Sequence, residues 1–65
     1  MEMTQGKLNE ILKRHKFWLD GSAEGMRADL RCADLRGADL RCADLRCADL
    51  RGAALRDAAL RCANL

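Results

Sequence analysis

The side chains with the most reactive chemistry in this sequence are its thiols and a single imidazole. The cysteines are Cys32, Cys42, Cys47 and Cys62. Thiolates bind soft metals and form disulfides, but no Cys-x-x-Cys pair occurs of the kind that supplies two zinc ligands from one loop. The only histidine, His15, has no serine or cysteine placed near it by any motif, and no glycine-rich phosphate loop is present. The sequence therefore predicts no catalytic centre, no cofactor and no metal site.

Charged residues recur in a fixed order in the second half of the chain. Five times an aspartate is followed by a leucine and an arginine, at Asp29, Asp34, Asp39, Asp44 and Asp49. Residues two apart on an extended segment project on the same side, ~7 Å from one another. Exposed ion pairs contribute only about 0–1 kcal/mol each. These recurring aspartates and arginines predict a solvated surface on which opposite charges neutralise one another.

Length and charge limit the classes of function. The chain has 65 residues, enough for one small domain of marginal stability, and its net charge of +2 is too weak to predict nucleic-acid binding. No apolar run approaches the ~20 residues of a membrane span. The start, Met-Glu-Met-Thr-Gln-Gly, lacks the basic and apolar regions of a secretory signal. We therefore expect a cytoplasmic protein with no membrane partner and mostly reduced cysteines.

From Ala28 onward the sequence is an internal repeat of five residues. The units are ADLRC, ADLRG, ADLRC, ADLRC, ADLRG, AALRD, AALRC and a final ANL. In a helix this period would scatter the leucines, because five residues advance by ~500°. On an extended segment the alanine and the leucine two residues later point to the same side. If the chain turns a corner after each unit, as in a solenoid, every alanine and leucine from Ala28 to Leu65 faces a common axis and is buried.

Residues 7–20 are predicted to form a helix with one apolar face, on which His15 also lies. The expected core residues of this helix are Leu8, Ile11, Leu12, Trp18 and Leu19. Thr4 is a candidate N-cap, and Gly21 stands where a helix stop belongs. Because the end of a solenoid exposes apolar side chains and unpaired edges, we interpret the helix as a lid on the first coil.

Phe17 does not fit this apolar face, because it falls ~180° from Leu8 by helical phase. It lies instead among Glu10, Lys13 and Arg14. Either the helix frays near its end and Phe17 folds under, or Phe17 is an exposed anchor for another protein, since aromatic residues are enriched in interface cores.

The A(D/N)LRx units resemble the pentapeptide-repeat family, whose fold is a right-handed quadrilateral β-helix. The resemblance covers residues 28–65, and a preceding helix is a common companion. It implies four faces per coil, so that residues 28–47 form the first coil and the second coil stops inside its fourth face at Leu65. The predicted fold class is therefore β: a capping helix and linker at 1–27, followed by a solenoid of about two coils at 28–65.

The coil register implied by the resemblance places Cys62 directly above Cys42, one strand spacing of ~4.8 Å away. That separation is within the range for a disulfide, but parallel side-chain directions make the geometry awkward. In this register the four cysteines lie on three faces, which excludes a single four-cysteine metal site. We expect reduced corner residues, with oxidation of Cys42 and Cys62 as the open alternative.

Some pentapeptide-repeat proteins imitate duplex DNA and occupy the DNA site of type II topoisomerases, which implies a long acidic rod. Here eight arginines outnumber six aspartates in residues 27–65, and the solenoid is shorter than two coils. The repeats also carry no aromatic platform for bases. DNA mimicry and DNA binding are both disfavoured, and a non-enzymatic protein-interaction module is the predicted function.

The second coil is predicted to pair end to end with a second copy of the chain. No further coil in the sequence covers its leucines, and its outward aspartates give way to alanine and asparagine. Such an edge templates pairing, and a two-fold axis would close the contact without forming fibres. The expected contact residues are Leu50, Ala54, Leu55, Ala59, Leu60, Asn64 and Leu65. Two alternatives are a longer solenoid of which this is a segment, and a small inhibitor that binds a host enzyme or a nucleic-acid-binding protein.

Overall fold

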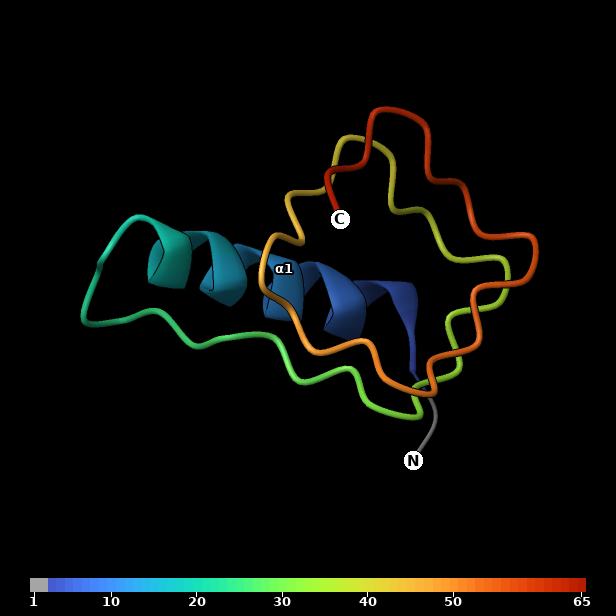
Figure 1. Cartoon of the computed structure of the whole chain (residues 1–65), viewed down its shortest axis with the longest axis horizontal. Helices are drawn as coiled ribbons and strands as arrows, with labels where there is room; N and C mark the ends of the chain where they lie inside the picture. Colours follow the sequence, from blue (N-terminus) through green and yellow to red (C-terminus); the bar gives the residue numbers. More distant parts are fainter. Residues whose placement is uncertain (1–2) are drawn as a thin grey trace.

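The computed structural model describes residues 3–65 as one helix, a linker and a coiled backbone (Figure 1). The helix α1 spans Gln5–Leu19, two residues earlier at its start than the pattern predicted. It begins there because the side chain of Thr4 accepts a hydrogen bond of 3.1 Å from the backbone N–H of Lys7. The N-cap prediction is confirmed, and Gly21 follows the end of the helix with a φ of +82°.

The repeat region winds into two stacked coils, in which each unit of the second coil lies on the unit four repeats earlier. Parallel bridges join Asp29 to Asp49, Asp34 to Ala54, Asp39 to Ala59 and Asp44 to Asn64. On the first face Leu30 N–H donates to Asp49 C=O over 2.8 Å, and Asp49 N–H donates to Ala28 C=O over 3.0 Å. Equivalent bonds recur on the other three faces, so each segment is held by its counterpart in the neighbouring coil.

The β-class prediction is therefore confirmed in part. A helix precedes the repeats and parallel bridges link the coils, but within residues 3–65 these bridges are isolated and no sheet forms. The physical reason is the length of the unit, because a corner interrupts the extended backbone every five residues.

Each corner is a turn closed by a backbone hydrogen bond, such as the 3.1 Å bond from Ala33 N–H to Leu30 C=O. The fifth residue of every complete unit has a positive φ, between 58° and 72°. A positive φ at the third position alone is the signature of a type II turn. Gly37 and Gly52 adopt it freely, whereas the cysteines and Asp57 adopt it against the preference of L-residues.

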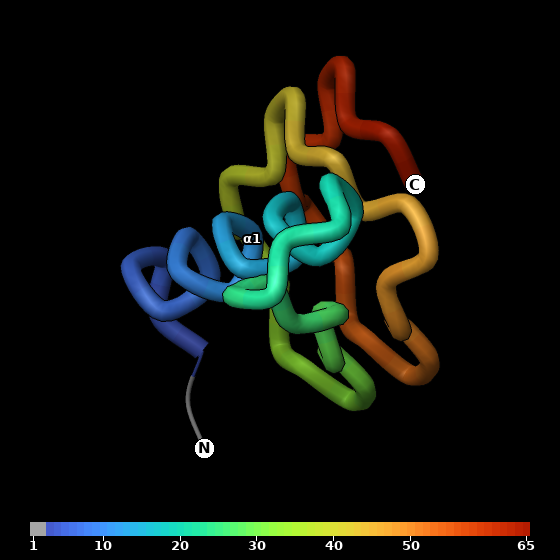
Figure 2. The backbone as a smooth tube through the Cα atoms, turned by 90° about the vertical axis from the view of Figure 1, so that its left-hand side faces the viewer, coloured from blue at the N-terminus to red at the C-terminus, as the bar shows by residue number. Residues whose placement is uncertain are grey.

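The core lies between α1 and the second coil, within the first coil. Its leucines are at most 1% exposed, namely Leu30, Leu35, Leu40 and Leu45. Figure 2 shows α1, the first coil (green to yellow) and the second coil (orange to red) in that order. The first coil is thus covered on both sides, and the second on one. The predicted burial is confirmed for Ala28 and the first-coil leucines. The other inward alanines and the leucines from 50 to 60 are only half-buried, and the prediction is wrong for Leu65, which is 61% exposed.

Candidate interaction surfaces at the two ends of the solenoid

The first coil has an outer edge of backbone groups that α1 partly satisfies, which we call the capped end. The side-chain amide of Gln5 accepts a 2.9 Å hydrogen bond from Asp39 N–H and donates a 3.0 Å bond to Asp39 C=O. The amide therefore pairs with this residue as a neighbouring strand would. Nothing in the sequence pattern singled out Gln5, because it lies one turn before the apolar face begins.

His15 makes the second polar contact at the capped end and is fully buried. Its Nδ1 accepts a 3.0 Å hydrogen bond from Ala28 N–H, and its Nε2 lies 2.7 Å from Arg46 C=O. A backbone amide can only donate and a carbonyl can only accept, so the ring is neutral with its proton on Nε2. His15 thus joins the start of the first coil to its last unit, and the ring stacks on Trp18 at 5.5 Å.

The apolar part of the lid is narrower than predicted. Leu8 is buried, and Ile11 and Leu12 pack against the same core. The prediction is wrong for Trp18, which is 39% exposed, and Leu19 is half-buried without joining that core. The reason is visible in Figure 1, where the C-terminal turns of α1 (teal) extend to one side of the coils. The helical pattern identifies which face of the helix is apolar, but it does not show where the coils that cover this face end.

Phe17 lies where α1 meets the linker. The helix continues through Leu19, so fraying does not explain its position. Phe17 is half-buried and lines a surface hollow with Glu10, Lys13, Arg14 and Glu24. The linker folds back along the helix, with Met26 N–H donating to Arg14 C=O over 3.0 Å. Its role as a partner anchor stays a prediction.

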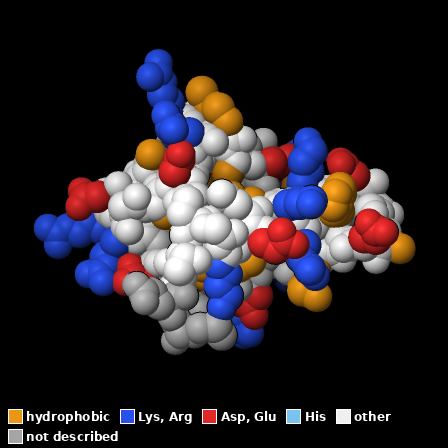
Figure 3. Space-filling view, turned by 180° about the vertical axis from the view of Figure 1, so that it is seen from behind, with side chains coloured by type: hydrophobic (Ala, Val, Ile, Leu, Met, Phe, Trp, Pro, Cys, Tyr) orange, Lys and Arg blue, Asp and Glu red, His pale blue; other side chains and the backbone are white. Residues whose placement is uncertain are grey.

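The outward aspartates and arginines form clamps within single units. In the first, Arg31 Nε lies 2.8 Å from Asp29 Oδ1 and Arg31 Nη2 lies 2.9 Å from Asp29 Oδ2. The hydrogen bonds from the arginine side chain lower the pKa of Asp34, Asp39 and Asp44 to about 2. Figure 3 shows acidic and basic side chains interspersed on one face of the molecule. The predicted neutralised surface is confirmed for these units.

The second coil carries the opposite edge of the solenoid, which we call the open end. Its backbone N–H groups that point away from the first coil donate to no acceptor within residues 3–65, whereas all seven first-coil counterparts donate to the second coil. The unpaired donors belong to Leu50, Gly52, Leu55, Asp57, Leu60, Cys62 and Leu65. The leucines at the open end are half-buried, except Leu65, which is exposed. All predicted contact residues lie in this coil.

Two arginines beside the open end have no clamp. Ala54 and Ala59 replace the aspartates that would pair with Arg56 and Arg61. In the part of the chain that the structure describes, neither arginine forms an ion pair. Two neighbouring faces of the second coil therefore carry positive charge that no carboxylate within residues 3–65 pairs with.

The cysteines all lie at corners and are free and exposed. Cys42 and Cys62 share a surface hollow with Asp39, Arg41 and Arg61. The pKa of the Cys42 thiol is raised, chiefly by its hydrogen bond with the Cys62 thiol. Cys32 instead faces Gly52, since a Cβ at that glycine would lie 3.2 Å from its sulfur. Among the described residues no three histidine, cysteine or acidic side chains cluster to hold a metal.

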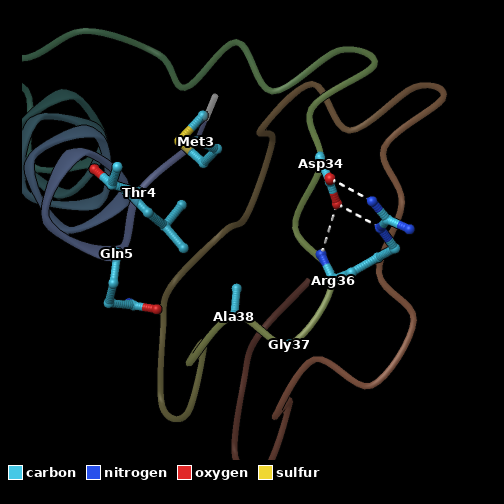
Figure 4. A pocket seen from close by; sticks show the side chains of 8 residues that line it. Met3, Thr4, Gln5, Asp34, Arg36, Gly37 and Ala38 are labelled. Carbon is cyan, nitrogen blue, oxygen red and sulfur yellow. Dashed lines mark hydrogen bonds and ion pairs between the residues drawn. The ribbon is translucent and has the colours of Figure 1, made fainter. Parts of the chain in front are cut away.

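A further hollow lies at the capped end, between the start of α1 and the second face of the first coil (Figure 4). Met3, Thr4, Gln5 and Leu8 line one side. The other side is formed by residues 34–38, where Arg36 clamps Asp34 on the rim. This hollow is the gap that the narrow lid leaves beside the first coil.

The helix of the described residues, α1, does not have the length and apolar composition of a membrane span.

These observations define, within residues 3–65, a short solenoid with a helix over one end and unpaired backbone N–H groups at the other. Its repeats match the family model described as pentapeptide repeats, in eight copies over residues 27–57 and 40–65. The matched residues make up more than half of the chain, so the chain belongs to the pentapeptide-repeat family. No curated protein and no solved structure matches it. Membership favours a protein-interaction module, in a family of generally non-enzymatic proteins.

Proposed function

We propose that this chain is a non-enzymatic assembly module that pairs end to end with a second copy through the open end of its solenoid. The observation that carries this proposal is the row of N–H groups along the second coil that have no acceptor within residues 3–65. They lie next to leucines that are only partly buried, whereas the equivalent leucines of the first coil are fully buried. Unpaired strand edges attract further strands.

The hydrogen-bonding pattern of the open end suits a second copy. At the first face, Ala48 C=O and Leu50 N–H flank Asp49 and point away from the first coil, as Ala28 C=O and Leu30 N–H point toward the second. If a two-fold axis relates two copies, the second coil of one copy runs antiparallel to that of the other. The partner then presents the same two groups in the opposite order along the chain. Ala48 C=O of each copy then meets Leu50 N–H of the other, as in an antiparallel pair.

Burial and charge support the same contact. Leu50, Leu55 and Leu60 are half-buried, and pairing would remove their remaining apolar surface from water at about 25 cal/mol per Å². Alanines at the outward positions 54 and 59 remove negative charge and bulk where the partner coil would approach.

Analytical ultracentrifugation of the 65-residue chain at micromolar concentration tests the proposal. We expect a dimer, and Leu60→Lys should dissociate it. Leu65→Asp is the safer variant, because Leu65 is already exposed and its replacement leaves the monomer core intact. Arg46→Lys, in the first coil, is the control that should leave the dimer unchanged. A folded wild-type chain that stays monomeric would refute end-to-end pairing.

The second candidate function is that of a small inhibitor that binds a host enzyme or a nucleic-acid-binding protein. Arg56 and Arg61, which form no ion pair within residues 3–65, favour an acidic partner surface. Imitation of DNA remains disfavoured, because each aspartate that precedes a repeat leucine is neutralised by the arginine two residues later. A host protein retained by the wild-type chain but released by Arg56→Ala, with the dimer unchanged, would favour this function over self-assembly.

A further inference from the structure

Cys42 and Cys62 occupy equivalent corners of the two coils. Cys42 N–H donates a 2.9 Å hydrogen bond to Arg61 C=O, and the preceding bridge joins Asp39 to Ala59. Both cysteines have nearly the same positive φ, 59° and 62°, so their side chains leave the backbone in parallel directions. Adjacent strands lie ~4.8 Å apart. The fold therefore holds two thiols side by side, one strand spacing apart and open to solvent.

The other two cysteines have no such neighbour. The position above Cys32 is Gly52, and no residue within 3–65 stacks on Cys47. All four cysteines share the same corner position, the same exposure and a positive φ. The chain thus contains one stacked thiol pair and two isolated thiols that serve as matched controls.

The geometry of the pair suits a bridging ion better than a direct bond. A disulfide needs Cβ atoms ~3.5–4.5 Å apart and side chains that turn toward each other. Parallel corners oppose that turn. Two metal–sulfur bonds of ~2.3 Å in a line hold the sulfur atoms ~4.6 Å apart, close to the spacing of the coils.

The charges around the two thiols favour a complex in which both thiolates hold one cation. A monovalent cation held by two thiolates carries a net charge of −1. Arg61 lines the same hollow and has no carboxylate partner within residues 3–65, whereas Arg41 is clamped by Asp39 at 2.9 Å. Arg61 is therefore the cation available to offset the negative charge of the complex.

We propose that Cys42 and Cys62 form a two-coordinate binding site for a soft, thiophilic monovalent cation, of which Cu⁺ is the physiological example. Soft thiolate ligands favour Cu⁺, zinc and iron–sulfur clusters. Structural zinc sites and iron–sulfur clusters take four ligands, so a pair of thiolates suits Cu⁺. In the binding step two thiols and one Cu⁺ give a bis-thiolate complex and release two protons to the solvent. The oxidation state of the metal does not change, so no oxidant or reductant takes part. This site differs from the four-cysteine site excluded above, because it needs only two ligands.

Anaerobic titration of the reduced full chain with Cu⁺, in competition with a chromophoric Cu⁺ chelator, tests the site. Native mass spectrometry gives the stoichiometry. We expect one Cu⁺ per chain, with affinity at least tenfold lower in Cys42→Ser and in Cys62→Ser. Cys32→Ser and Cys47→Ser should bind as the wild type does. Arg61→Ala should weaken binding several-fold, whereas Arg31→Ala should not.

Two results would overturn the proposal. One is an equal loss of binding in Cys47→Ser and Cys42→Ser, which would mean that any exposed thiol suffices. The other is a species of one Cu⁺ shared between two chains, which would mean that the ligands come from different molecules. Repeating the titration with Leu65→Asp separates the site from self-association, because the proposed stoichiometry does not depend on a dimer.

Discussion

The first and second coils are built from nearly the same five-residue unit, yet their leucines differ in burial. Leu40 is fully buried, whereas Leu60, which lies above it on the same face, is half-buried. The first coil has α1 on one side and the second coil on the other, and all seven of its inter-coil donors are paired. Within residues 3–65 the second coil pairs with a neighbour on one side only. In a solenoid, the neighbours of a unit therefore decide how much its leucine contributes to stability.

Removal of the lid, α1, should have the largest effect on the difference in leucine burial between the two coils. Deletion of residues 1–20 would expose Leu30, Leu35, Leu40 and Leu45 at the capped end and free the groups that Gln5 and His15 satisfy. We expect the 21–65 fragment to aggregate or to lack a cooperative unfolding transition in circular dichroism. A soluble, monomeric fragment with a cooperative transition would show that the helix is not required.

A matched pair of substitutions compares the coils directly. Leu40→Ala should lower the free energy of unfolding by about 2–5 kcal/mol, since it leaves a cavity among buried side chains. Leu60→Ala should cost only ~1 kcal/mol, because part of that side chain already contacts water. Urea denaturation below the dimerisation concentration measures both, and equal losses would contradict the difference in burial.

His15 tests how far the capped end depends on polar contacts. His15→Ala would leave Ala28 N–H and Arg46 C=O without partners in a buried place, at about 1–3 kcal/mol for each unsatisfied group. Gln5→Ala is the control, because its contacts with Asp39 are exposed and water can replace them. We expect the His15 variant to unfold at clearly lower urea concentration than the Gln5 variant. If the Gln5 variant unfolded at the lower urea concentration, Gln5 would be the more important contact between the helix and the coils.

Acid should have the smallest effect, and it should act mainly on the clamped units. The pKa of Asp34, Asp39, Asp44 and Asp49 is lowered from 3.8 to about 2 by hydrogen bonds from the paired arginines. A depressed folded-state pKa stabilises the fold above the unfolded value, and that stability is lost as the pH falls through the folded value. The urea midpoint should therefore decline between pH 4 and pH 2. The decline should shrink in Asp34→Ala/Asp39→Ala, and an unchanged slope would mean that the clamps add nothing.

Local patterns in the sequence predicted the features that depend on residues close together in the chain. The five-residue period predicted a solenoid with inward alanines and leucines. The resemblance to the pentapeptide-repeat family implied four units per coil, which the bridges between residues twenty apart confirm. The aspartate and arginine two residues apart predicted that their charges neutralise one another, and Thr4 was correctly predicted as the N-cap of the helix. Each follows from spacing along an extended or helical backbone, which is set by bond geometry.

The tertiary structure alone decided how the helix meets the coils. Gln5 contacts Asp39 and His15 contacts Arg46, pairs that are 34 and 31 residues apart in the chain. The exposure of Trp18 and Leu65 likewise depends on where a neighbouring element stops, and the residues themselves carry no signal for that. Periodicity specifies which way a side chain points, but its burial depends on the distant backbone that packs against it, and that placement exists only once the chain has folded.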